Sequence, residues 1–291
     1  MGSPRSIDIG FYPERLEVEA GDITLTTRSD LDESVAKVRA WPTVQGDWIY
    51  ALDIERIFPL PVTHTLSHAN ADGPEHLDFI IWALSFFAGM RLTATEAGFV
   101  DATPIVPGKL CDFSVRSGRE FAEVVGLAER YWQAHRTERP ATQRWESAVH
   151  ALLLAQYPKA LPYEEFIYLY IALDACFVMM ESAVKVAGKA KPSGGHPNRI
   201  PWMCGELGMP VPSWADGEIS GIRNFTIHEG LFMGVPLGFA GHDRKSAENL
   251  SLEMGNLVSR LLVAILGAPN AGYVRSPVTS YQRHGLDLRR P

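Results

Sequence analysis

The sequence predicts an α+β protein in which a mixed strand and helix domain is followed by an all-α bundle of four or five helices. Apolar and β-branched residues alternate with polar ones over much of residues 6–27, which is the period of half-buried strands. After about residue 140 the apolar residues recur at helical spacing instead. Between the two patterns lies Arg136-Thr-Glu-Arg-Pro140, a polar segment typical of a linker. The expected division is residues 1–138, residues 139–268 and a tail over residues 269–291.

The composition is that of a soluble globular protein. Hydrophobic residues make up 46% of the 291 residues and charged residues 21%, which excludes disordered and fibrous chains. The three widely spaced cysteines cannot build a disulfide framework and indicate a reducing compartment. The N-terminal residues have no apolar core of signal-peptide type, and the longest apolar run, Phe79–Met90, is too short to span a bilayer. We expect a cytoplasmic protein with no membrane partner.

The first domain is expected to begin with short strands and to end with helices. Gly21-Asp22 separates two alternating segments and predicts a hairpin turn. Residues 58–75 are rich in Pro, Gly and Asn, so they predict a loop, and the apolar stretch after them predicts a buried helix. The expected strands are Ser6–Tyr12, Leu16–Glu19, Ile23–Thr27 and Trp48–Ile54, and the expected helices are Glu75–Arg91 and Gly118–His135.

The second domain shows helical periodicity and almost no strand-like alternation. Its longest apolar segment is apolar nearly all round, so we expect that helix at the centre of the bundle. Pro158 and Pro162 separate it from the helix before, and Ser213 is a candidate N-cap of a later one. The expected helices are Thr142–Tyr157, Tyr163–Val186, a short one over Pro201–Leu207, Trp214–Phe232 and Asp243–Leu266. The tail that follows carries Arg275, Arg283, Arg289 and Arg290.

The net charge of -7 is unevenly distributed along the chain. Residues 1–140 hold 13 Lys and Arg against 21 Asp and Glu, whereas residues 141–291 hold 14 against 13. A polyanion would therefore meet the second half of the chain. The most basic segment there is a Gly- and Pro-rich loop with its flanks. We expect it to supply phosphate contacts from Lys185, Lys189, Lys191 and Arg199.

Several standard sites are missing from the sequence, which has no Gly-x-Ser-x-Gly elbow, no phosphate loop and no Gly-x-Gly-x-x-Gly after a strand. His64 and His68 stand four residues apart, with His76 as a candidate third metal ligand. Their Pro- and Gly-rich surroundings argue against a helical metal site, so we expect no metal. His196 and Cys204 are interpreted as a loop histidine and a core cysteine. No cofactor is expected.

The segment Gly221-Ile-Arg-Asn-Phe-Thr-Ile-His-Glu-Gly230, on the third main helix of the second domain, is the strongest candidate site. An Arg and a His five residues apart is a weak pattern that recurs elsewhere in this chain. Only Arg223 of such pairs is followed directly by Asn. Arg223, Asn224 and His228 therefore form one candidate motif.

This motif resembles that of the HEPN superfamily, whose domains are four- or five-helix bundles with an Arg, four to six residues and a His. A polar residue such as Asn very often follows the Arg. A second likeness is Ile167–Glu181, which resembles the acidic-centred helix that precedes the motif helix in that family. The resemblance covers about residues 140–268. It implies a homodimer that is either a metal-independent ribonuclease of a toxin or antiviral defence system, or a relative that has lost cleavage and only binds.

The residue types of the motif suit cleavage of RNA without a metal. The reaction needs a base for the 2′-hydroxyl proton, positive charge at the phosphorane and an acid for the leaving oxygen. His228 can be base or acid near neutral pH, Arg223 offers a planar fork to phosphate oxygens, and Asn224 shares the helical face of His228 as an orienting group. A 2′,3′-cyclic phosphate product follows. Asp174 and Glu181 lie near one face of the preceding helix and are expected to support the arginine.

Three other interpretations stay open. Arg223 and His228 could be a surface arginine paired with Asp174 or Glu181 and a histidine that caps a helix C-terminus. The helical domain could be a non-enzymatic module that dimerises and binds a nucleotide or a protein. It could also merely position the acidic N-terminal module, which would then act through its histidine-rich segment. That module, of unknown role, could equally bind an inhibitor or a trigger.

Overall fold

The computed structural model describes residues 2–40, 43–45, 48–50, 57–94, 99–101, 105–157, 160–188, 195–215, 217–237, 244–279 and 283–288. The chain has a mixed α+β fold, as the sequence predicts, and it divides into two compact units. Unit 1 comprises residues 1–142 and 283–289, and unit 2 comprises residues 143–282 and 290–291. The C-terminal residues are thus shared between the units.

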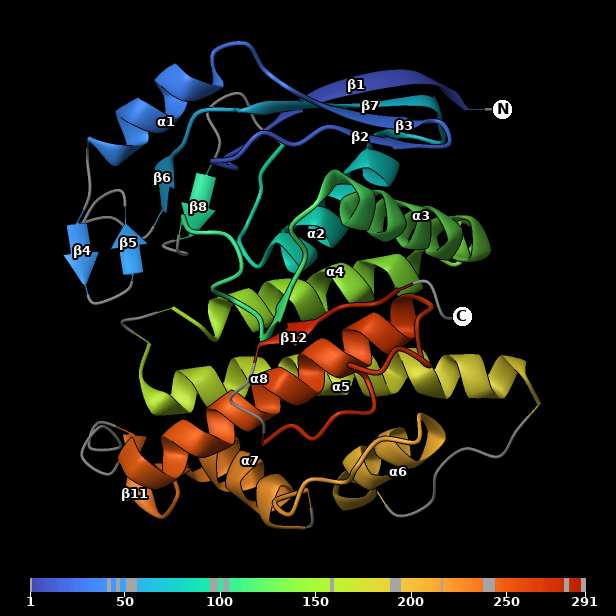
Figure 1. Cartoon of the computed structure of the whole chain (residues 1–291). Coiled ribbons are helices and arrows are strands. Elements are labelled where there is room, and N and C mark those ends of the chain that lie inside the picture. Colours follow the sequence, from blue (N-terminus) through green and yellow to red (C-terminus); the bar gives the residue numbers. More distant parts are fainter. Residues whose placement is uncertain are drawn as a thin grey trace. The chain divides into compact units, whose positions relative to one another are not determined.

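A four-stranded antiparallel sheet with the order β1-β7-β3-β2 forms one layer of unit 1 (Figure 1). Strand β3 covers Ile23–Thr27 as expected, and the turn at Gly21-Asp22 joins it to β2. The expected strands at Ser6–Tyr12 and Leu16–Glu19 are shifted by a few residues. The four strands are β1 (Ser3–Ile9), β2 (Val18–Ala20), β3 (Ile23–Thr27) and β7 (His64–Ala71).

Strand β7 corrects the loop that the sequence predicted over residues 58–75. It pairs with β1 on one side and β3 on the other, and its side chains alternate in burial so that His64, Leu66 and His68 face inward. Two of these inward positions hold histidines where a strand pattern would show apolar residues. The loop prediction rests on the Pro and Gly residues that flank this segment. In the structure the segment is a strand, and two of its histidines are buried.

Helices α2 (Pro74–Ala88) and α3 (Gly118–His135) pack against each other and against the sheet of unit 1 (Figure 1). Helix α3 has the bounds that the sequence predicted. It begins at a capping box, in which the Ser117 hydroxyl accepts the backbone N–H of Glu120 and the Glu120 carboxylate accepts that of Ser117. Helix α2 ends at Gly89, where φ is +60° and an added Cβ would lie 2.7 Å from the Cα of Gly108, so only glycine fits.

The other described elements of unit 1 are short. Strand β12 pairs in parallel with β9, which brings residues 283–288 of the expected tail into this unit. Helix α1 was not predicted, and the expected strand over Trp48–Ile54 is described as far as Tyr50. These elements are α1 (Leu31–Arg39), β4 (Thr43–Gln45) with β5 (Trp48–Tyr50), β6 (Ile57–Pro59) with β8 (Phe99–Asp101), and β9 (Phe113–Ser114) with β12 (His284–Gly285).

Unit 2 is helical, and its helices follow the predicted order. Helix α5 packs along α8, and the fully buried Trp145 of α4 donates its indole N–H to the carbonyl of Leu262 on α8 at 3.2 Å. Helices α6 and α7 lie beside α5 (Figure 1). The helices are α4 (Arg139–Leu154), which begins in the last residues of unit 1, α5 (Pro162–Val186), the 3-10 turn η1 (His196–Asn198), α6 (Arg199–Glu206), α7 (Gly217–Glu229) and α8 (Arg244–Leu266).

Two findings modify the all-α prediction for this unit. The short strands β10 (Leu231–Phe232) and β11 (Val235–Pro236) form a hairpin directly after α7. Helix α7 therefore ends at Glu229 instead of Phe232, and Gly230 follows with φ of +67°. Glycine adopts this left-handed conformation without strain, so it ends the helix and lets the chain turn into the hairpin.

The buried Arg260 of α8 holds part of the expected tail against the helix. Its guanidinium donates to the carbonyls of Ser276 at 3.0 Å and Pro277 at 3.1 Å. The guanidinium carbon lies 4.5 Å from the centre of the Tyr273 ring. The side chain of Asn256 donates to the carbonyl of Val278 at 2.9 Å. Residues 273–278 are thereby built into unit 2 through backbone hydrogen-bond acceptors, which a sequence pattern does not reveal.

Helix α5 is long and apolar enough to cross a membrane by length and composition, with a mean hydropathy of 1.6 over its most apolar 18-residue window. Half of that window is buried inside the fold. A core helix of a soluble protein passes the same test, and α5 packs along α8.

Candidate functional site

The motif predicted from the sequence lies on α7, and the helix separates its three residues. Arg223 is half-buried on the side that faces α5, whereas Asn224 and His228 are exposed. Among the residues that the structure describes, no hydrogen bond or ion pair involves the side chain of His228. The structure therefore assigns different surroundings to the arginine and the histidine of the motif.

Arg223 has polar neighbours but no carboxylate partner within the described ranges. Its Nη1 donates to Oδ1 of Asn224 at 2.9 Å, and its guanidinium carbon lies 6.0 Å from the centre of the Tyr170 ring on α5. Its Nε is buried and has no acceptor among the described residues. Because the guanidinium has no carboxylate partner among the described residues, its positive charge remains available to bind an anion.

Tyr170 also contacts a second element, the 3-10 turn η1. Its hydroxyl lies 3.1 Å from Nδ1 of His196. Helix α6 begins directly after this turn, and Arg199 in its first turn donates to Asp174 of α5 at 2.6 Å and covers the ring of Phe177 at 4.5 Å. We call the five polar side chains that meet here the Tyr170 cluster: Tyr170, Asp174, His196, Arg199 and Arg223.

The charges of the Tyr170 cluster favour a neutral imidazole. Burial lowers the pKa of His196, the cations Arg199 and Arg223 lower it further, and Asp174 opposes them. Burial and Asp174 raise the pKa of Tyr170 to about 12, against the two arginines. At neutral pH the cluster thus holds two guanidinium groups, one carboxylate, a neutral imidazole and a phenol that keeps its proton.

The supporting residues predicted from the sequence are only partly brought together. Asp174 lies in the cluster, but its carboxylate pairs with Arg199 and not with Arg223. Glu181 is half-buried further along α5, and Lys185 is exposed in the last turn of that helix. Lys189 and Lys191 lie outside the described residues, so the expected phosphate contacts from them are not placed.

Sequence reasoning missed Tyr170 and His196 as site residues. The two belong to different elements, and a segment of 26 positions separates them, so no local spacing connects them. His196 was interpreted as a loop histidine because its neighbours are Gly and Pro. The signal that was present is its place next to Arg199 in the most basic segment of the chain.

Unit 1 holds a second polar cluster, made by His68 of β7, His76 of α2 and Glu129 of α3, which we call the Glu129 cluster. Nε2 of His76 lies 2.7 Å and Nε2 of His68 lies 3.4 Å from the same oxygen of Glu129. The side chains of His68 and His76 are 2% and 0% exposed. His76 stacks on Trp132, whose indole N–H donates to Asp72 at 2.9 Å.

The hydrogen bonds of the Glu129 cluster determine where the imidazole protons lie. Nδ1 of His68 accepts the backbone N–H of Asn70 at 3.0 Å, and Nδ1 of His76 accepts that of Asp72 at 3.4 Å. A neutral imidazole whose Nδ1 accepts must carry its proton on Nε2. Both Nε2–H groups therefore donate to Glu129. The three ligand atoms lie within 4.8 Å of one another, but a metal would have to displace both protons.

The charge of Glu129 is stabilised by the same contacts. Burial alone would raise its pKa, but the hydrogen bonds from His76 and Gln133, together with the two imidazoles, outweigh burial and lower the pKa to about 2. Glu129 therefore stays ionised throughout the ordinary pH range. The cluster joins β7, α2 and α3 across the core of unit 1.

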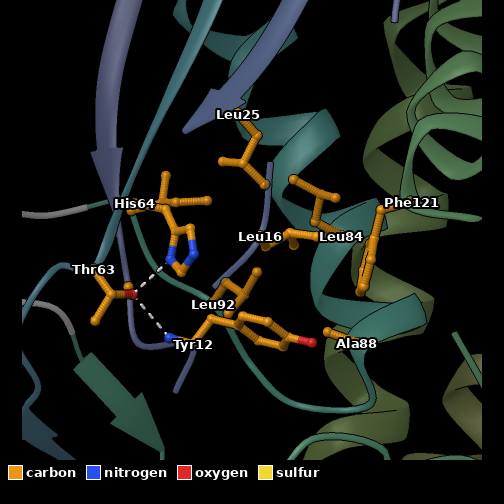
Figure 2. Close-up of a pocket in the computed structure, with 11 residues that line it drawn as sticks. Tyr12, Leu16, Leu25, Thr63, His64, Leu84, Ala88, Leu92 and Phe121 are labelled. Atoms are coloured by element: carbon orange, nitrogen blue, oxygen red, sulfur yellow. Dashed lines mark hydrogen bonds between the residues drawn. The ribbon is translucent and has the colours of Figure 1, made fainter. Parts of the chain in front are cut away.

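His64 does not belong to the Glu129 cluster, so the three histidines considered as candidate metal ligands do not lie together. It lies at the edge of a small cavity of about 10 Å³ that is lined mostly by apolar side chains, among them Leu16, Leu84 and Phe121 (Figure 2). Its Nδ1 contacts Oγ1 of Thr63 at 2.9 Å, while its Nε2 is buried with no partner in the part of the chain that is described. Burial lowers its pKa to about 4.

Comparison of the chain with protein-family models, with curated proteins and with solved structures finds no match.

Proposed function

We propose that this protein is a metal-independent endoribonuclease of HEPN type whose site lies on unit 2. The observation that carries the proposal is the state of Arg223, which is half-buried in the Tyr170 cluster and has no carboxylate partner among the described residues, because Asp174 pairs with Arg199. A planar guanidinium in this state fits the non-bridging oxygens of a phosphodiester. The motif Arg223-Asn224 with His228, and the order of the helices, supply the other support.

The chemistry of the proposal follows from the side chains. Arg223 binds the phosphate and stabilises the charge that develops in the transition state, and Asn224 orients the guanidinium through its 2.9 Å hydrogen bond. An imidazole accepts the 2′-hydroxyl proton, the 2′-oxygen attacks phosphorus and the 5′-oxygen leaves. The products are a 2′,3′-cyclic phosphate and a 5′-hydroxyl.

The cell compartment that we propose is the cytoplasm, and the biological role that we propose is in a toxin or antiviral system.

A test uses purified protein and an unstructured RNA in the presence of EDTA. We expect cleavage that persists in the chelator and ends in cyclic phosphate, and we expect Arg223→Ala to abolish it. The matched control is Arg15→Ala, which removes an exposed arginine of unit 1 that pairs with Asp32. Cleavage that needs a divalent metal, or that Arg223→Ala leaves at the level of the control, would contradict the proposal.

A second candidate function is a non-catalytic module that dimerises and binds a nucleotide or a protein. The observation in its favour is the exposed apolar pair on α7, Phe225 at 51% and Ile227 at 49% exposure, on either side of Thr226 and close to His228. Exposed apolar side chains of this size are typical of contact surfaces. This function predicts no RNA turnover and a loss of dimer for Phe225→Ser with Ile227→Ser. The homodimer itself is common to both proposals.

A further inference from the structure

We infer that His196 is the catalytic base of this site and that Tyr170 is the residue that positions it. The inference deepens the proposed ribonuclease function and rests on it. The motif assigned the proton transfer to His228, but the imidazole that shares the surroundings of Arg223 is His196. The 3-10 turn that carries it packs against α7, the helix of Arg223.

A single tyrosine contacts both groups that the reaction requires. The hydroxyl of Tyr170 lies 3.1 Å from Nδ1 of His196, and the face of its ring lies 6.0 Å from the guanidinium carbon of Arg223. The ring of Tyr170 is roughly stacked with that of His196, at an interplanar angle of 27°. An imidazole held through Nδ1 presents Nε2 in a defined direction.

The protonation state of His196 suits a base. The groups that face it are Tyr170 and Asp174 of α5, Arg199 of α6 and Arg223 of α7. Burial and the two arginines lower its pKa, and only Asp174 acts in the other direction. A lowered pKa means that the imidazole is neutral at pH 7. The inference requires the tautomer in which Nδ1–H donates to the oxygen of Tyr170, because Nε2 then keeps its lone pair and can accept a proton.

The step balances with the groups present and water. Nε2 of His196 accepts the proton of the 2′-hydroxyl while the 2′-oxygen forms a bond to phosphorus. The bond between phosphorus and the 5′-oxygen breaks, and the 5′-oxygen takes a proton from water. The resulting hydroxide is neutralised when the imidazolium of His196 releases its proton, which restores the neutral base. Tyr170 takes no part in the transfer because its pKa is raised to about 12.

This assignment changes what a second copy of the chain has to supply. If His228 were the only histidine of the site, base and acid would have to come from two chains. With His196 next to Arg223, each chain carries both a base and a phosphate-binding group. The cleavage step then needs no residue from a partner, even where the protein is a dimer.

The experiment compares His196→Ala with His228→Ala in the RNA cleavage assay, using full-length protein and circular dichroism to verify folding. We expect His196→Ala to lower kcat by about 10²- to 10⁴-fold and His228→Ala to lower it by less than about tenfold. The reverse order would overturn the inference and leave the ribonuclease function intact. An inactive wild-type protein would overturn both.

A pH profile separates a catalytic histidine from a structural one. The rate should rise with pH as His196 loses its proton, with a midpoint below the usual value of about 6.5. Arg199→Gln removes a cation that lowers the pKa of His196, so in this variant the rise of the rate should occur at higher pH. Tyr170→Phe should lower kcat and leave KM within about threefold, because the phenol positions the base and leaves phosphate binding intact. A rise of the rate with an unchanged midpoint pH in Arg199→Gln would contradict the assignment of His196 as the base.

Binding without cleavage gives an independent readout. A 2′-O-methyl RNA oligonucleotide lacks the proton that the base removes, so it should bind without being cut. In an NMR titration we expect it to shift the ring signals of His196 and to leave those of His64 in place. Ring signals of His196 that do not respond to a bound oligonucleotide would rule out this histidine as the base.

Discussion

The Glu129 cluster of unit 1 and the Tyr170 cluster of unit 2 use the same residue types in opposite ways. In the Glu129 cluster two almost fully buried imidazoles both donate to one carboxylate, and every ring nitrogen has a partner. In the Tyr170 cluster a half-buried imidazole contacts a neutral phenol and lies among arginines. The first arrangement consumes the hydrogen-bonding capacity of its histidines, and the second leaves one nitrogen of its histidine available.

Under the proposed function, this difference separates a structural cluster from a catalytic one. Buried polar groups that are fully paired stabilise a single packing arrangement and are costly to disrupt. A group whose charge state is shifted and whose donor or acceptor stays unused can exchange a proton or bind a ligand. The predictions that follow test this contrast from the largest expected effect to the smallest.

The largest effect should come from Arg223. Arg223→Lys keeps the charge but loses the planar fork, and we expect it to lower kcat by roughly 10²-fold, within the range seen when a transition-state donor is removed. Its free energy of unfolding should stay within about 1 kcal/mol of wild type, because the guanidinium makes no ion pair within the described ranges. Single-turnover cleavage and urea unfolding measure the two quantities. A lysine variant with full activity would place Arg223 outside the chemistry.

The next largest effect concerns His64 and acid stability. Its pKa in the folded protein is about 4, below the unfolded value of about 6.5, so the unfolded chain takes up the proton first as the pH falls. Stability should therefore fall by up to about 3 kcal/mol between pH 6.5 and pH 4 and then level off for this group. Urea unfolding at a series of pH values measures it.

The matched variant for this prediction is His64→Leu, which has similar volume and places apolar atoms against the cavity of Figure 2. Thr63 keeps a partner in this variant, because its hydroxyl also accepts the backbone N–H of Tyr12 at 3.0 Å. The decrease between pH 6.5 and pH 4 should disappear. A variant that retains the full decrease would assign it to other groups.

A smaller loss is expected for Glu129→Gln. The amide removes the charge that two imidazole N–H groups bind, and we expect a destabilisation of about 2 kcal/mol at neutral pH. The pKa of Glu129 is about 2 in the folded protein, below its unfolded value, so its contribution is present at neutral pH and is lost as the pH falls from about 4.5 to 2. The acid transition of the variant should lack this lower step. Equal acid profiles of wild type and variant would contradict the prediction.

The smallest effect is expected from added zinc. Metal binding at the Glu129 cluster would have to remove two Nε2 protons whose position the backbone N–H groups of Asn70 and Asp72 enforce. We therefore expect equimolar zinc at pH 7 to change Tm by less than about 1 °C, where a site bound at a hundred times its Kd would add about 2.7 kcal/mol. A large rise in Tm that Glu129→Gln abolishes would show that the cluster is a metal site.

Elements with local signals were predicted well. The predicted start of α3 coincides with the capping box of Ser117 and Glu120, which acts within one turn. The same locality explains β3, whose alternation needs no partner to be recognised. Elements whose identity depends on the rest of the fold were not predicted. Strand β7 is predicted as a loop because Pro and Gly flank it and because two of its inward positions hold histidines, of which His68 becomes reasonable only once Glu129 of α3 lies across from it.

The residues of the candidate site also differ in whether a local sequence signal identifies them. Arg223 was found from its spacing and from the asparagine after it. His196 was not, because the property that distinguishes it is its distance to Tyr170, a residue on another helix. Asp174 was expected to support Arg223, but in the structure its carboxylate forms an ion pair with Arg199 in the first turn of α6. Competition between two arginines for one acid is decided by packing.

By itself the sequence determined the mixed α+β class, the position of most helices in unit 2, and the presence of an arginine motif in the less acidic half of the chain. These properties depend on hydrophobic period, capping and turn residues, which act over a few positions. The tertiary structure alone decided which imidazoles are paired and which keep a free nitrogen. That outcome depends on distances between side chains far apart in the chain, and burial sets their charge once those distances exist.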